Sequence, residues 1–117
     1  MIESVIVTKS KEFSIRIIRL YKYLTEEKNE YIMSKQLLRS GTSIGANVRE
    51  GRYGESKKDF ISKMSIALKE AVETEYWLEL LKETEYITKE QYESIRKDNS
   101  ELAKLLTSTV KRAKESK

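Results

Sequence analysis

The sequence predicts an all-α fold, an up-down-up-down antiparallel four-helix bundle. The 117 residues contain no proline and only four glycines, and 36% of them are charged. This mixture is typical of mostly helical proteins. Apolar residues recur at three- and four-residue steps in four stretches, and short turns between the stretches place consecutive helices antiparallel. The length predicts one domain over residues 1–117.

The first helix is expected from about residue 10 to residue 28. Its core stripe consists of Phe13, Ile17, Leu20 and Leu24. The nine residues before it are mixed in character, and Val5-Ile6-Val7 predict either a small strand or an arm packed on the bundle. A second face carries Arg16, Arg19 and Lys22 beside Tyr23. This face is either solvated, with apolar stems covering the helix, or a phosphate-contacting surface.

The second helix is expected over residues 31–53, after a turn at Asn29-Glu30. Gly41 and Gly45 remove side-chain bulk and let another helix approach closely, although each costs about 1 kcal/mol relative to alanine. Ala67 and Ala71 of the third helix offer a surface to receive them.

A row of polar side chains follows one face of the second helix. Arg39, Ser43, Asn47 and Glu50 recur at three- and four-residue steps. Glu70 and Glu73 lie one turn apart on the third helix. We expect these six residues to form a structural polar network between helices, with the arginine and asparagine donating to the glutamates.

The third and fourth helices are expected over residues 57–85 and 89–114, and both starts carry capping signals. Ser56 with Asp59 begins the third, and Thr88 with Gln91 forms a capping box at the fourth. Asn99 interrupts the apolar stripe of the fourth helix. A polar residue at such a position fixes register at some cost in stability.

The chain lacks the residues that most catalytic mechanisms use. There is no cysteine for a disulfide and no histidine for a general base or metal ligand. Ser43 has no activating base, and the glycines of GTSIGANVREG do not match a phosphate-binding loop. We expect no enzyme and no cofactor. A carboxylate metal site built from Glu50, Glu70 and Glu73 is the weakest alternative.

The positive charge is unevenly spread along the chain. Residues 1–58 carry 12 Lys and Arg against 7 Asp and Glu, whereas residues 59–117 carry 11 against 12. This asymmetry is compatible with an anionic partner. The candidate nucleic-acid-binding residues are Arg16, Arg19, Lys22, Arg49 and Arg52.

Two further features bear on partners and location. No apolar run reaches the roughly 20 residues that span a bilayer, and the N-terminus is acidic where a signal peptide is basic. We therefore expect no membrane partner and a cytoplasmic protein. Tyr76, Trp77 and Tyr86 add apolar surface beyond what a small bundle buries, which predicts a homo-oligomer.

The stretches QLLRSGTSIGANVREG (36–51) and ESKKDFISKMSIALKEAVETEYWLELL (55–81) carry a family resemblance. They resemble the small bacterial four-helix-bundle proteins first noticed as open reading frames in intervening sequences of 23S ribosomal RNA genes. The most specific positions are Arg39, Ser43, Ile44, Asn47, Glu50, Gly51, Glu70 and Glu73. The resemblance implies an antiparallel bundle that assembles into a homopentameric ring.

A related branch of that family is the accessory protein of diversity-generating retroelements, a pentamer whose basic surface binds nucleic acid and a reverse transcriptase. Two functional hypotheses follow. One is a non-enzymatic oligomer that binds structured RNA or another nucleic acid through a basic face. The other is a protein–protein scaffold or accessory subunit with no nucleic-acid contact.

Overall fold

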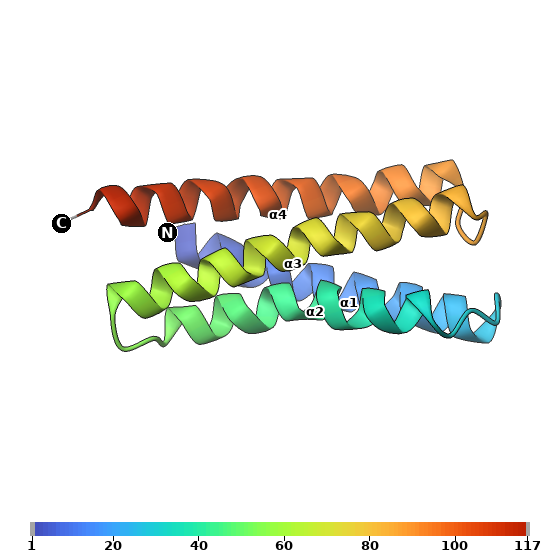
Figure 1. Ribbon diagram of the computed structural model, residues 1–117, viewed down its shortest axis with the longest axis horizontal. Helices are drawn as coiled ribbons and strands as arrows, with labels where there is room; N and C mark the ends of the chain where they lie inside the picture. Colours follow the sequence, from blue (N-terminus) through green and yellow to red (C-terminus); the bar gives the residue numbers. More distant parts are fainter. Residues whose placement is uncertain (1, 117) are drawn as a thin grey trace.

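Four α-helices make up the described chain. The computed structural model describes residues 2–116, with side chains from Val5 onward. The helices are α1 (Ile2–Glu26), α2 (Met33–Arg52), α3 (Lys57–Glu83) and α4 (Lys89–Glu115), and residues 2–116 contain no strand. They run side by side along a rod of 49 × 21 × 19 Å (Figure 1). The predicted all-α class is confirmed.

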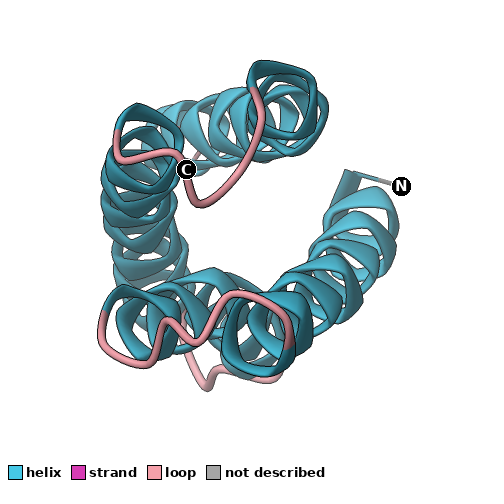
Figure 2. Cartoon of the chain, turned by 90° about the vertical axis from the view of Figure 1, so that its right-hand side faces the viewer, coloured by secondary structure: helices cyan, strands magenta, loops and turns pink. Residues whose placement is uncertain are grey.

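Each helix packs against two others, in the order α1–α2–α3–α4 and back to α1. The contact between α1 and α4 is the sparsest, and Figure 2 shows the arrangement open on that side. The α1–α2 and α3–α4 loops lie at one end of the rod, and the α2–α3 loop lies at the other end with both termini (Figure 1). This arrangement is compatible with the predicted bundle.

Helix α1 begins eight residues earlier than the sequence pattern suggested. The expected strand or arm at Val5-Ile6-Val7 is wrong, because these residues continue the helix. Ile6 is 1% exposed and Ser10 is also buried, so both extend the stripe of Phe13 and Ile17 by two turns. With no proline or glycine before residue 10, nothing in the sequence ends the helix there.

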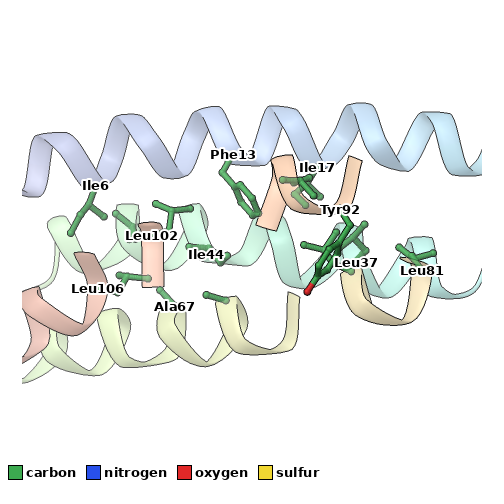
Figure 3. Close-up of a cluster of buried hydrophobic side chains, with 14 of the residues drawn as sticks. Ile6, Phe13, Ile17, Leu37, Ile44, Ala67, Leu81, Tyr92, Leu102 and Leu106 are labelled. Carbon is green, nitrogen blue, oxygen red and sulfur yellow. The ribbon is translucent and has the colours of Figure 1, made fainter. Parts of the chain in front are cut away.

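The core contains buried apolar side chains from all four helices. Ile6, Phe13 and Ile17 of α1 form one cluster with Leu37 and Ile44 of α2 and with Leu102 and Leu106 of α4 (Figure 3). A Cβ at Gly41 would lie 2.7 Å from the Ile17 side chain, and one at Gly45 would lie 3.2 Å from the Ser10 carbonyl oxygen. The two glycines therefore face α1, and the expected packing on Ala67 and Ala71 of α3 is wrong.

The α1–α2 connection is built around Asn29 and Glu30. Asn29 takes a left-handed φ of 54°, which asparagine tolerates better than most residues. The N–H of Glu30 then bonds to the carbonyl of Leu24 at 2.9 Å, which closes the end of α1. The buried Glu30 carboxylate accepts hydrogen bonds from the N–H groups of Ile32, Met33 and Ser34 at 3.2, 3.0 and 2.7 Å. Helix α2 is thus capped by a glutamate and begins two residues later than expected.

The other two connections follow their sequence signals. Ser56 accepts the Asp59 N–H at the start of α3, and the capping box of Thr88 and Gln91 at the start of α4 is confirmed. Helix α3 ends at Glu83, two residues earlier than expected, because Glu85 takes a left-handed φ of 68°. The chain turns there into α4.

A few polar groups lie inside the bundle. Thr74 of α3 donates to Ser40 of α2 at 3.0 Å. Asn99 is 2% exposed and donates from Nδ2 to the Ala71 carbonyl at 2.9 Å, while its Oδ1 has no partner among the described residues. These contacts tie α3 to both of its neighbours at mid-length.

Candidate functional site

The centre of the predicted polar network is Arg39, which bridges α2 and α3. Its Nη1 donates to Glu70 at 3.0 Å and its Nη2 contacts Glu73 more closely still. Glu73 also accepts the indole N–H of Trp77 at 3.0 Å. The hydrogen bonds from Trp77 and Arg39 lower the pKa of Glu73, and the bond to Glu73 raises the pKa of Arg39. One positive charge faces two carboxylates, so the cluster keeps a net charge of −1, and the pairing of Arg39 across two helices favours a structural role.

The remaining network residues are arranged differently from expectation. Ser43 donates to the Arg39 carbonyl at 2.5 Å and Asn47 donates to the Ser43 carbonyl at 2.9 Å, both within α2. Glu50 pairs with Lys63 of α3 at 2.9 Å. Within the subunit the row therefore makes three separate contacts at the surface: Arg39 with α3, Ser43 and Asn47 within α2, and Glu50 with Lys63. We call this row the Arg39 seam. The side chains of Arg39 and Glu50 keep 49% and 59% of their surface exposed.

The predicted basic residues of α1 separate in the structure. Arg16 reaches across to α4, where it pairs with Asp98 at 2.7 Å and bonds to the Ser94 hydroxyl at 2.6 Å. Arg19 lines a groove between α1 and α4, and Lys22 is exposed. Arg16 thus closes the sparse α1–α4 side of the bundle, and its charge is compensated by Asp98.

Arg49 and Arg52 lie at the opposite end of the rod, within the most basic part of the surface. We define the basic end as residues 49–63 and 104–116, which surround the α2–α3 loop and the end of α4 (Figure 1). It carries 9 Lys and Arg against 4 Asp and Glu, a net charge of +5. The acidic end, residues 20–36 and 77–93, carries 5 against 8, a net charge of −3. The bundle is therefore electrically polar along its long axis.

Few of these cations are compensated. Among the described residues, one ion pair, Lys63 with Glu50, lies within the basic end, and Lys57 bonds instead to the Ser116 carbonyl. The guanidinium carbon of Arg52 lies 5.7 Å from the centre of the Tyr53 ring. Eight of the nine cations therefore have no carboxylate partner among the side chains of residues 5–116. They are Arg49, Arg52, Lys57, Lys58, Lys104, Lys111, Arg112 and Lys114.

Sequence reasoning missed the contribution of α3 and α4 to this surface. The signals were present as Lys57-Lys58 and as the run Lys111-Arg112 with Lys114. Antiparallel packing brings the start of α3 beside the end of α4, so residues more than fifty positions apart join one surface. The topology, and not either motif alone, creates the patch.

Neither a cluster of metal-ligating side chains nor a membrane-spanning helix is present among the residues that the structure describes. No group of three or more His, Cys, Asp or Glu residues in the described chain is arranged to hold a metal ion. Glu70 and Glu73 are bound to Arg39, and Glu50 is bound to Lys63. In the part of the chain that the structure describes, every helix is too polar or too short in its apolar runs to cross a bilayer.

Comparison with known proteins gives the chain a family and a structural relative. The family model described as 23S rRNA-intervening sequence protein matches residues 3–108. A solved structure, a protein of unknown function from the S23 ribosomal protein family of Bacteroides thetaiotaomicron VPI-5482, is 61% identical with a TM-score of 0.94. The match covers 95% of this chain and 99% of that one. Among curated protein sequences, none matches.

Proposed function

The chain belongs to the 23S rRNA-intervening sequence protein family, and we propose that it is a non-enzymatic protein that binds structured RNA through the basic end of its bundle. One observation carries the proposal, the separation of charge between a basic end of +5 and an acidic end of −3. A polyanion is attracted to one end of such a rod and repelled by the other, so the field orients the encounter as well as driving it.

The uncompensated cations supply the binding energy in this proposal. RNA phosphates carry condensed counterions, and each Lys or Arg that neutralises a phosphate releases one of them. Cations held by a carboxylate contribute less, because the ion pair must first be broken. For this reason the basic end is a better candidate than Arg16, whose guanidinium is engaged by Asp98. Arg49 and Arg52 therefore belong to the proposed RNA-binding site. Arg19 and Lys22 lie outside it and serve as positions for a control variant.

An electrophoretic mobility shift assay with a structured 23S ribosomal RNA fragment tests the proposal. Binding is measured at salt concentrations from about 50 to 200 mM. One variant carries Arg52→Gln, Lys58→Gln and Arg112→Gln. A control of equal charge carries Arg19→Gln, Lys22→Gln and Lys28→Gln. Each lost phosphate contact lowers the slope of the logarithm of the binding constant against the logarithm of the salt concentration by about 0.7–0.9 in magnitude. The slope of the first variant is therefore expected to fall by about 2–3, and that of the control to stay close to the wild-type value.

Two results would reject this function. Absence of retardation at about 50 mM salt would remove nucleic acid as a partner. Equal loss in both variants would show that the RNA responds to total charge and not to the basic end. In the second case the Arg16, Arg19 and Lys22 face expected from the sequence becomes as good a candidate as the end itself.

We also propose that the subunit assembles with copies of itself, as the family resemblance implies for a pentameric ring. The supporting observation is an exposed apolar surface on α3 beside the Arg39 seam. Val72 and Tyr76 keep 66% and 54% of their surface exposed. A second copy covering this face would bury both side chains and the half-exposed seam. Light scattering is expected to give about five times the chain mass of 13.7 kDa, and a value of one chain mass would reject assembly.

The same surface supports the second functional class, a protein scaffold without nucleic-acid contact. Recovery of a protein partner in a pull-down that nuclease leaves unchanged would favour it over RNA binding. The cytoplasm remains the proposed location. A stoichiometric metal found by elemental analysis of the purified protein would instead revive the carboxylate site of Glu50, Glu70 and Glu73.

A further inference from the structure

An exposed aromatic residue lies in the middle of the basic end. Tyr53 follows the last residue of α2 and begins the loop of residues 53–56 that leads into α3. It keeps 75% of its surface exposed. In the described chain no core residue of the bundle packs over it, since it belongs neither to the buried core nor to the apolar side chains packed against that core. A role in folding therefore does not account for it.

Cations surround this ring along the chain and across the fold. The Arg52 guanidinium lies over the ring, with its carbon 5.7 Å from the ring centre. Arg49 precedes it by one helical turn, and Lys57 and Lys58 follow at the start of α3. The bond from Lys57 to the Ser116 carbonyl brings the end of α4 to the same place. The ring is thus an apolar surface inside a positively charged one.

That combination is the chemistry that binds unpaired nucleotides. Every nucleobase has a π-face that stacks on an aromatic side chain, and neighbouring Lys and Arg side chains hold the adjacent phosphates. Bases inside a duplex are already stacked on one another, so a protein ring reaches bases in loops, bulges and single strands. The neighbouring Arg52 adds to the platform, since guanidinium planes also stack on bases.

We propose that Tyr53 is a stacking platform for an unpaired nucleotide, so that the RNA bound at the basic end is recognised at a single-stranded or loop segment. The inference rests on the proposed RNA-binding function and adds the class of RNA to it. The cations of the basic end set the salt dependence of binding, and Tyr53 sets the preference for unpaired over paired RNA.

Fluorescence anisotropy on two labelled probes tests this, using the full chain. One probe is a single-stranded RNA of about 12 nucleotides, within the usual site sizes, and the other is the blunt duplex of the same sequence. The variants are Tyr53→Ala, Tyr53→Leu and Tyr53→Phe. Tyr31→Ala is the matched control, because Tyr31 is an exposed tyrosine (59%) at the acidic end. Circular dichroism verifies that each variant is folded.

The wild type is expected to prefer the single strand. Tyr53→Ala and Tyr53→Leu are expected to weaken single-strand binding by roughly 5- to 100-fold, with the duplex affinity and the salt slope unchanged. Tyr53→Phe and Tyr31→Ala keep the wild-type affinity. Equal binding by Tyr53→Ala and wild type, or an equal loss for duplex and single strand, overturns the inference while the RNA-binding function stands. If wild-type protein retards the structured 23S fragment but binds neither probe, the inference falls and the function stands; if it binds none of the three RNAs, both fall.

Discussion

Replacing Glu30 by alanine removes the cap of α2, and the structure allows the cost to be worked out. The carboxylate accepts three backbone N–H groups, of Ile32, Met33 and Ser34. Ile32 is 79% exposed, so water replaces its lost partner. Ser34 is fully buried, and its N–H is left unpaired. An orphaned buried donor costs about 1–3 kcal/mol and loss of a cap about 0.5–2 kcal/mol, so Glu30→Ala is expected to cost about 2–4 kcal/mol.

Urea unfolding followed by circular dichroism, at one fixed protein concentration, measures this cost. Glu30→Gln keeps one acceptor oxygen and is expected to lose about half as much. Glu27→Ala changes an exposed glutamate in the same loop and is expected to stay within about 0.5 kcal/mol of wild type. A Glu30→Ala variant as stable as Glu27→Ala would refute the cap as the organiser of the α1–α2 connection.

Three further predictions concern single residues. Glu85→Gly is expected to raise unfolding free energy by about 0.5–1 kcal/mol, because glycine tolerates the φ of 68° that costs other residues about 1–2 kcal/mol; urea unfolding measures it, and a loss of stability would contradict it. Burial and the hydrogen bond to Glu75 raise the pKa of Tyr92 above the ordinary 10.0. Its stabilising contribution is therefore complete below pH 10 and is lost as pH rises toward the folded-state value. Ultraviolet titration is expected to show one tyrosine that ionises after the others and disappears in Tyr92→Phe. The pKa of Glu73 is lowered below the ordinary 4.5, so its contribution is present above that value and is lost as pH falls through the folded-state value. In Glu73→Gln, the unfolding free energy is expected to fall less on acidification than in wild type, by a difference of less than about 1 kcal/mol. The same pH dependence in both proteins would contradict this.

The helices were predictable from sequence because their signals are local. Apolar spacing located all four, and the capping box of Thr88 and Gln91 was readable from four consecutive residues. The start of α1 was not, since Ile6 and Ser10 look unremarkable until α2 and α4 bury them. Glu30 was assigned to a turn because a cap formed by a buried glutamate, reaching forward to three amides, lacks the usual Ser, Thr or Asp signature.

The surfaces were harder to predict because they depend on which helices become neighbours. The contact of Arg39 with Glu70 and Glu73 follows from the α2–α3 pairing and was anticipated as part of a network. Its exposure was not, since the sequence does not tell how far the core extends around each helix. The basic end required the complete topology, because it joins the α2–α3 loop to a helix end more than fifty residues away.

Cross-linking locates the bound RNA most directly. RNA substituted with a photoreactive thiouridine is cross-linked to the wild-type protein under ultraviolet light, and the modified peptides are identified by mass spectrometry. We expect cross-links within residues 49–58 and 111–116, at the basic end. Cross-links confined to residues 15–28 of the opposite half would contradict the assignment of RNA binding to that end.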